Sequence, residues 1–340
     1  MKNLVILGAG TAGTMMANHL RPKLYLNEWN ITIVDQYKTH YYQPGFLFLP
    51  FDTYTEKQVK KNGKKFIPKS VNYIQKKIEQ IFPEENKVAL EGETLHYDVL
   101  IIATGSKIAP EETAGLVGPL WKKDIFDFYT FEGALALRNK LRDWQGGKLV
   151  VHITEMPIKC PVAPLEFAFL ADSFFINKDM RDKVDLTFVT PMDGAFTKPT
   201  ATKELNHLLE EKNIKIVPNF NIEKVDNENK TISDYSGKEV KFDCLVSIPL
   251  HSGDPMIERS GLGDDFIDGG VIGTSIENPW ENWNKASYEG RSSNFDIKKV
   301  EYARDAVILS DGTSVETYAS QFEIQAQSLG QLVDALGFDT

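Results

Sequence analysis

The chain has 340 residues, of which 42% are hydrophobic, so it is long enough for two or three domains. It shows neither a secretory leader pattern nor a run of about 18 apolar residues, and we expect a soluble cytoplasmic protein. Two cysteines and six scattered histidines exclude a disulfide framework and argue against zinc, so we expect a reducing compartment and no metal. The net charge of −10 is concentrated in residues 261–340, which disfavours nucleic acid or an anionic membrane surface as the partner of that segment.

Strand-like and helix-like segments alternate through the first part of the chain. Their patterns predict strands at 3–7, 31–35 and 98–103, a helix over 11–20, and a hairpin at 83–97. This order is typical of a parallel sheet flanked by helices.

A second set of alternating segments follows a predicted hinge at Gly115–Pro119. Strands are predicted at 148–153, 185–190, 214–217 and 242–248, with helices at about 162–176 and 202–212. After Pro249 the alternating pattern of strands and helices is no longer recognisable. In the tail we predict a hairpin around Asp311-Gly312 within 305–315, and a helix over 320–336.

A glycine-rich turn joins the first predicted strand to the first helix. It runs Gly8-Ala9-Gly10-Thr11-Ala12-Gly13 after the apolar stretch 4–7. Gly8 allows a tight turn, Gly10 lets the backbone approach a pyrophosphate, and Gly13 lets the helix pack on the strand. The amino terminus of the helix then faces the phosphates. The turn predicts a site for the ADP half of a dinucleotide.

Two further segments complete the predicted cofactor site. Asp35 ends the second strand and is placed to accept hydrogen bonds from an adenosine ribose. Residues 99–105 form an apolar strand ending in a small-residue turn, where the backbone can approach a cofactor a second time, which favours FAD over NAD. The predicted FAD-binding residues are Gly8, Gly10, Thr11, Ala12, Gly13, Asp35, Gln36, Ala103, Thr104 and Gly105.

These patterns together predict the fold class and the domains. We predict an α/β protein with two tandem Rossmann-like domains of three layers (β/β/α), followed by an atypical α+β carboxyl-terminal segment. The predicted ranges are 1–114 for the FAD-binding domain, 115–255 for the second domain and 256–340 for the carboxyl-terminal segment.

The second unit has prolines where a nicotinamide-binding turn would need glycines. Pro157, Pro161 and Pro164 cannot give close backbone approach to a pyrophosphate, so NAD(P)H binding is not expected there. Cys160 stands at this turn, near a predicted helix amino terminus and beside Lys159. Such an environment lowers the pKa of a thiol and favours the thiolate. We therefore predict a nucleophilic thiol.

Glu166 is the second predicted catalytic residue. It follows Cys160 by six residues, within two helical turns, and could transfer protons in the same site. The alternatives are that Cys160 is a small buried hydrophobic residue and that Glu166 is a solvated surface charge. Cys244, inside the apolar run 242–246, is predicted to be strand core.

Several long strings of residues carry a resemblance to a known family. They are 40–50 (HYYQPGFLFLP), 103–113 (ATGSKIAPEET), 155–167 (EMPIKCPVAPLEF), 189–199 (VTPMDGAFTKP) and 249–253 (PLHSG). On these strings the chain resembles the sulfide:quinone oxidoreductases, flavoproteins of the pyridine nucleotide-disulfide oxidoreductase superfamily, from its start to about residue 265.

The resemblance implies FAD in the first unit, a second unit that has lost NAD binding, and Cys160 as a redox cysteine close to the flavin. Sulfide, or another small sulfur species, would be oxidised to a persulfide, with electrons passing through FAD to a quinone. Glu166 matches a carboxylate that assists proton transfer. The resemblance also implies peripheral contact with the inner face of the cell membrane, and a homo-oligomer is left open.

The resemblance ends near Asp265. Family members continue with a strand ending in Gly-Asp, a second redox cysteine and apolar carboxyl-terminal helices, and the tail has no recognisable counterpart of these. Three alternatives therefore stay open. One is a flavin- or nucleotide-binding relative without sulfide oxidation, and another is a chain with an altered or truncated carboxyl terminus. The third, an NAD(P)H-dependent flavin reductase, is disfavoured by the prolines.

Overall fold

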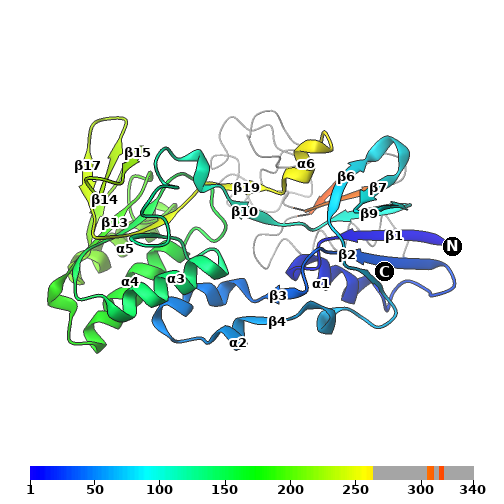
Figure 1. Cartoon of the computed structure of the whole chain (residues 1–340), viewed down its shortest axis with the longest axis horizontal. Helices are drawn as coiled ribbons and strands as arrows, with labels where there is room; N and C mark the ends of the chain where they lie inside the picture. The colour runs from blue at the N-terminus through cyan, green and yellow to red at the C-terminus, as the bar shows by residue number, and fades with distance from the viewer. Residues whose placement is uncertain (263–304, 310–313, 318–340) are drawn as a thin grey trace. The chain divides into compact units, whose positions relative to one another are not determined.

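The computed structural model describes residues 1–262, 305–309 and 314–317. The chain forms two compact units, each built from separate stretches of sequence (Figure 1). Among the described residues, unit 1 contains 1–41, 60–107, 252–262 and the two tail strands at 305–309 and 314–317, and unit 2 contains 42–59 and 108–251. Strands β10 (Ser106–Ile108) and β19 (His251–Gly253) pair where the chain passes between the units.

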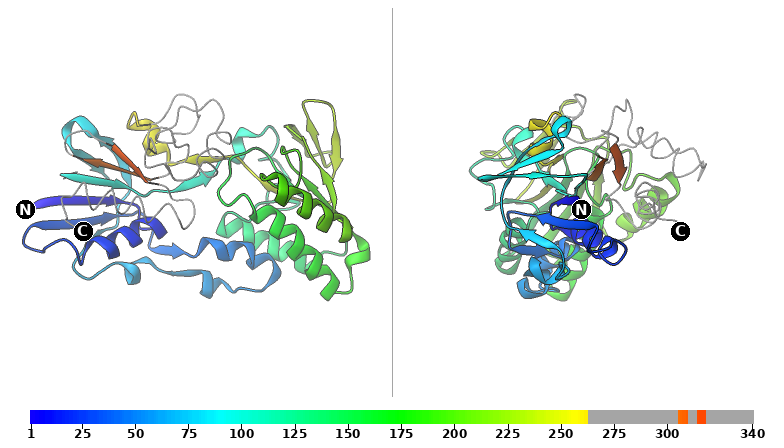
Figure 2. Two further views of the ribbon diagram at one scale, coloured as in Figure 1. Left: turned by 180° about the vertical axis from the view of Figure 1, so that it is seen from behind. Right: turned by 90° about the vertical axis from the view of Figure 1, so that its right-hand side faces the viewer.

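Unit 1 is organised around a six-stranded sheet. Its order is β21 (Ser314–Thr317), β20 (Asp305–Leu309), β9 (Val99–Ile102), β1 (Lys2–Leu7), β2 (Trp29–Val34) and β5 (Asn72–Ile74). The four strands from β9 to β5 are parallel, whereas β20 pairs antiparallel with β9 and with β21. The β20–β21 pair, orange in Figure 2, confirms the hairpin predicted in the tail. The helix predicted over 320–336 lies outside the described residues.

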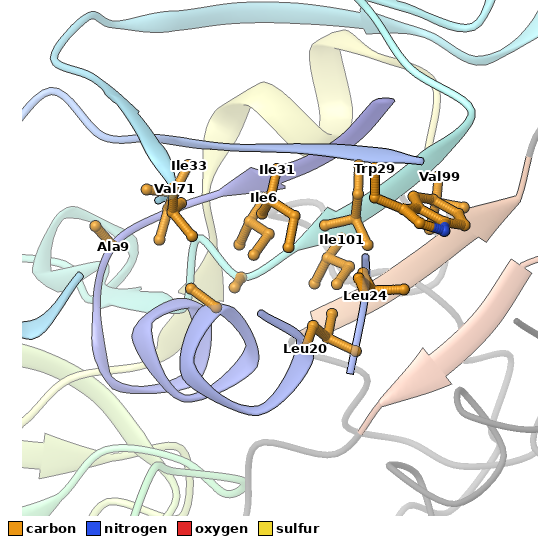
Figure 3. Close-up of a cluster of buried hydrophobic side chains, with 13 residues drawn as sticks. Ile6, Ala9, Leu20, Leu24, Trp29, Ile31, Ile33, Val71, Val99 and Ile101 are labelled. Carbon is orange, nitrogen blue, oxygen red and sulfur yellow. The ribbon is translucent and has the colours of Figure 1, made fainter. Parts of the chain in front are cut away.

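Side chains alternate between the two faces of this sheet, and each face is covered by a different layer. Leu4 and Ile6 point to the face covered by helix α1 (Thr11–Leu20), where Leu20 and other apolar side chains form one core (Figure 3). Val5 and Leu7 pack in a second core with strands β6 (Ile78–Phe82) and β7 (Lys87–Leu90) and with helix α6 (Pro255–Arg259). Strand β8 (Glu93–His96) completes the second layer.

Unit 2 repeats this layered arrangement. Its parallel sheet has the order β11 (Ile125–Phe126), β18 (Cys244–Ile248), β12 (Gly147–Ile153), β13 (Val184–Val189) and β14 (Lys215–Val217). An antiparallel sheet of β15 (Ile222–Asp226), β16 (Thr231–Asp234) and β17 (Glu239–Lys241) contributes to the core on one face. Helices α3 (Phe131–Asp143), α4 (Ala163–Asn177) and α5 (Pro199–Glu211) pack against β11, β12, β13 and β14. The predicted three-layer α/β class is confirmed.

The compact units interleave along the chain, which differs from the predicted contiguous ranges 1–114, 115–255 and 256–340. Strands β3 (Thr39–Tyr41) and β4 (Lys60–Asn62) pair, and the intervening residues 42–59, which include α2 (Glu56–Val59), belong to unit 2. There Phe51 contacts Phe167, with ring centroids 4.9 Å apart, and Arg142 binds Asp52. These long-range contacts hold residues 42–59 in unit 2.

The predicted hinge at Gly115–Pro119 is part of the packed body of unit 2. Gly115 has a φ of +76°, and a Cβ there would overlap the carbonyl oxygen of Val225. Ala114 forms a bridge with Lys224, and Leu116 is fully buried. The glycine therefore permits close backbone packing, and the boundary between the units lies at residues 107 and 108 instead.

Candidate functional site

The three glycines of the turn between β1 and α1 differ in what surrounds them. Gly8 has a φ of +96°, and a Cβ there would overlap the carbonyl oxygen of Ala103. A Cβ at Gly13 would overlap the carbonyl oxygen of Gly8, so both positions are required by internal packing. A Cβ at Gly10 would meet no described atom within 4 Å. The open side of Gly10 is where a ligand can approach the backbone.

The amino terminus of α1 is available to an anion. Gly10 is the N-cap, no side chain caps the helix among the described residues, and the first turn has no acidic residue. The first intrahelical bond runs from the N–H of Thr14 to the oxygen of Gly10, at 3.0 Å. The preceding N–H groups, including those of Thr11 and Ala12, therefore have no intrahelical acceptor. They and the helix dipole suit a phosphate.

Asp35 lies directly beside the glycine turn. One carboxylate oxygen accepts the N–H of Ala9 at 2.7 Å, and the other accepts the N–H of Tyr37 at 2.8 Å. Gln36 is exposed next to it. Each carboxylate oxygen can accept more than one hydrogen bond, so Asp35 can tie the turn to the end of β2 and still accept a ribose hydroxyl. That ribose contact stays a prediction.

His40 also contacts this turn, although the sequence did not mark it as a site residue. Its Nδ1 lies 3.1 Å from the carbonyl oxygen of Ala9, and because a carbonyl only accepts, Nδ1 must carry the proton. His40 reaches the turn because β3 follows β2 after a short loop. A histidine in a short edge strand gives no periodic signal that would have revealed this contact.

The turn after β9 approaches the same region of unit 1. The N–H of Ala103 donates to the oxygen of Leu7 at 2.7 Å, which holds the end of β9 beside the end of β1. The Oγ1 of Thr104 is buried and finds no hydrogen-bond partner among the described residues. Gly105 has a φ of +70° and an open Cβ direction. Together with the open face of Gly10, these features fit a dinucleotide such as FAD.

Cys160 lies in unit 2, at the turn between β12 and α4, as predicted. Its φ is +57°, and its thiol is half-buried. The backbone N–H groups of Ala163 and Val162, at the start of α4, are near enough to act on the thiol and lower its pKa. The predicted proximity to a helix amino terminus is therefore confirmed.

The predicted low pKa of this thiol is wrong. Burial is the largest influence and raises the pKa of Cys160, and the nearby carboxylate of Glu166 also raises it. The two backbone N–H groups and Lys159 lower the pKa, but together they do not offset burial. The ammonium of Lys159 donates to the Oε1 of Gln43 at 2.7 Å. The sequence shows that Lys159 is next to Cys160, but it shows neither that Lys159 binds Gln43 nor that the Cys160 thiol is buried.

The other residues predicted in unit 2 lie on α4, on β18 and in the turn before α4. Glu166 is exposed in the first turn of α4, close enough to Cys160 for its charge to act on the thiol. Cys244 is fully buried in β18, which raises the pKa of its thiol to about 12 and confirms that it is strand core. Pro161 and Pro164 stand at the start of α4, where the prediction placed them.

Two negative findings apply to the described residues only. Within 1–262 and the two tail strands, no group of three or more His, Cys, Asp or Glu side chains is arranged to hold a metal ion. No helix in the same part of the chain is long and apolar enough to cross a membrane.

The chain is similar to known proteins over most of its length. The profile of the family described as pyridine nucleotide-disulphide oxidoreductase matches residues 2–153. Sulfide:quinone oxidoreductase from Dictyostelium discoideum (mitochondrial) is 25% identical over 266 residues, which cover 77% of this chain and 59% of the relative. Sulfide-quinone reductase from Aquifex aeolicus is 26% identical over 270 residues, 76% of this chain and 61% of the relative.

Solved structures show the same relationship at the level of the fold. The crystal structure of the sulfide:quinone oxidoreductase from Aquifex aeolicus matches with a TM-score of 0.70 and 22% identity, covering 81% of this chain and 64% of that one. The chain thus spans about three fifths of the length of these relatives. Residues 2–153 thus match the profile described as pyridine nucleotide-disulphide oxidoreductase, and the chain is similar in sequence and in fold to sulfide:quinone oxidoreductases.

Proposed function

We propose that this chain is a flavoprotein oxidoreductase that oxidises sulfide, or another small sulfur species, through Cys160 and FAD, with a quinone as the electron acceptor. The observation that carries the proposal is the placement of Cys160, half-buried in the turn that leads into α4. The similarity of the chain to proteins named as sulfide:quinone oxidoreductases supports the same reaction class.

The role of Cys160 is to bind the sulfur atom that is oxidised. Its thiolate and HS⁻ form a Cys160 persulfide anion, with loss of one proton and two electrons. FAD, when bound, supplies the two-electron acceptor that this step requires. The N–H groups of Val162 and Ala163 stabilise the thiolate before the new S–S bond forms. Glu166, exposed beside the thiol, can accept the proton that is released.

Release of the product needs a second sulfur nucleophile. The 340 residues contain one further cysteine, Cys244, and this thiol is fully buried in β18. In this proposal an external thiolate, or a second sulfide ion, attacks the outer sulfur of the persulfide. It carries that sulfur away and regenerates the Cys160 thiolate, as in thiol–disulfide exchange. Turnover is then expected to depend on the concentration of this external acceptor.

The proposal also includes a peripheral location on the inner face of the cell membrane, where quinones dissolve. The acidic excess of the chain lies after residue 261, whereas residues 60–77 contain seven lysines and no acidic residue. Most of these lysines are exposed, and so is Phe66 among them. An exposed basic segment with an aromatic side chain suits anionic headgroups.

Sulfide-dependent quinone reduction by the purified, FAD-loaded protein tests the proposal. The assay uses a quinone dissolved in anionic phospholipid vesicles and compares Cys160→Ala with Cys244→Ala, each of which removes one sulfur atom. We expect Cys160→Ala to lose at least about 99% of the rate, because the sulfur-binding atom is gone. Cys244→Ala should keep most of it.

The outcomes separate the parts of the proposal. Equal rates for wild type and Cys160→Ala would contradict the role of Cys160, and no sulfide-dependent rate in any variant would refute the sulfide reaction. Protein that stays in the supernatant when the vesicles are pelleted would refute the membrane location alone. The alternative of a flavin-binding relative without sulfide oxidation predicts bound FAD and no turnover.

A further inference from the structure

Tyr129 contacts the backbone of Cys160. Its hydroxyl donates to the carbonyl oxygen of Cys160 at 2.9 Å, and the N–H of Ala163 donates to the same oxygen at 3.1 Å. Tyr129 precedes α3, whereas Ala163 begins α4. The carbonyl of the proposed redox cysteine is thus held from two different segments of unit 2.

This carbonyl belongs to a residue in an unfavourable conformation. Cys160 has a φ of +57°, in the left-handed region, which costs a non-glycine residue about 1 kcal/mol. Such a conformation persists only where the surroundings fix it. The same turn places the thiol at the start of α4, where the backbone N–H groups of Val162 and Ala163 lower its pKa. Holding the carbonyl therefore helps to hold the sulfur against the start of α4.

Tyr129 is itself fixed independently of its hydroxyl. Its ring meets the ring of His251 edge-on, with centroids 4.9 Å apart, and lies 5.0 Å from the ring of Phe128. The backbone N–H of Tyr129 donates to the carboxyl of buried Asp127. Loss of the hydroxyl alone should leave the ring in place, so a phenylalanine can replace Tyr129 with little disturbance of packing.

We propose that Tyr129 is a positioning residue for Cys160, and that its hydroxyl holds the Cys160 peptide in the left-handed conformation that places the thiol at the start of α4. The relevance to catalysis rests on the proposed function, because that function gives Cys160 its redox role. The conformational part concerns the thiol alone and can be measured without sulfide, quinone or FAD turnover.

Alkylation of Cys160 by iodoacetamide as a function of pH tests the inference. In the 340-residue chain with Cys244→Ala, Cys160 is the single thiol. Adding Tyr129→Phe should move the midpoint of the rate profile up by about half to one pH unit. The rate at a pH below the midpoint should then fall about three- to tenfold, because a thiolate with weaker N–H contacts is less stable. Tyr235→Phe, at a side chain that is 78% exposed in the same unit, is the matched control.

A second measurement keeps the inference testable if Tyr129→Phe is less stable. The ¹³Cβ chemical shift of labelled Cys160 reports the titration of folded molecules only, and its midpoint should shift in the same direction. An unchanged midpoint in both measurements would overturn the positioning role. A shifted midpoint in a chain that never oxidises sulfide would refute the proposed function and leave the positioning role intact.

Discussion

Gly10 and Gly13 stand three residues apart in one turn, and the structure gives them different tasks. The spacing of the glycines and the position of Asp35 were predictable, because a strand, a tight turn and a helix impose them. The raised pKa of the Cys160 thiol was not predictable, because it depends on how deeply the thiol is buried. The neighbouring Lys159 ammonium binds Gln43, which is 116 residues away in the sequence. Local sequence shows which groups are neighbours, but not how much water reaches them.

The two glycines offer a matched pair of substitutions. Gly10→Ala should leave the melting temperature of the apoprotein close to wild type, since a Cβ there meets no described atom within 4 Å. It should weaken FAD binding at least about tenfold, because the methyl group occupies the approach to the backbone. Gly13→Ala should lower the unfolding free energy by about 1–3 kcal/mol, since its Cβ would overlap the Gly8 oxygen. Thermal melts and flavin titrations distinguish the two, and wild-type FAD affinity in Gly10→Ala would show that Gly10 does not face the cofactor.

At the scale of elements, strands with a clear apolar pattern were predictable, and so were the short edge strand β14 and the tail pair β20–β21, whereas other short elements were not. Strands β1, β2, β9, β12, β13 and β18 were predicted within a few residues of their observed bounds. Strand β11 has only two residues and β5 only three, too few to show a period. Helix α3 was missed although Phe131, Ala134, Leu137 and Leu141 are buried at helical spacing behind the Thr130 cap. That signal was available in the sequence.

Strand β12 carries a titratable group into the core. His152 is fully buried, its Nδ1 lies 3.1 Å from the Oγ of Ser247 on β18, and burial lowers the pKa of the imidazole to about 3. The unfolded chain takes up a proton below a pKa of about 6.5, whereas the folded chain does not until about 3. The stability that His152 contributes as a neutral group is therefore present near neutrality and falls as the pH drops between these values.

The prediction is that His152 makes the protein about 2 kcal/mol less stable at pH 5 than at pH 7. His152→Asn can keep a hydrogen bond to Ser247 but cannot titrate, so this part of the pH dependence should disappear. Urea unfolding at the two pH values measures it, with His96→Asn, on exposed strand β8, as the surface control. If His152→Asn and wild type lose equal stability between pH 7 and pH 5, the buried imidazole is not the cause.

At the scale of the whole molecule, the α/β class followed from the order of elements, but the division into units did not. Residues 42–59 leave unit 1 between two paired strands and pack on α3 and α4, and the chain returns to unit 1 at residue 252. Domain ranges that are contiguous in sequence cannot describe this segment, because its contacts join residues far apart in the chain. Asp52 and Arg142, for example, are 90 positions apart. The tail hairpin likewise joins the first sheet from the far end of the sequence.

The central claim is that unit 1 holds FAD and that Cys160 of unit 2 passes electrons from sulfide to it. The most direct measurement is the visible absorption spectrum of the purified, FAD-loaded chain before and after anaerobic addition of sulfide. We predict a two-banded oxidised flavin spectrum that sulfide bleaches in wild type and in Cys244→Ala, but not in Cys160→Ala. A protein that takes up no FAD, or a bound flavin that sulfide leaves oxidised in wild type, would contradict this claim.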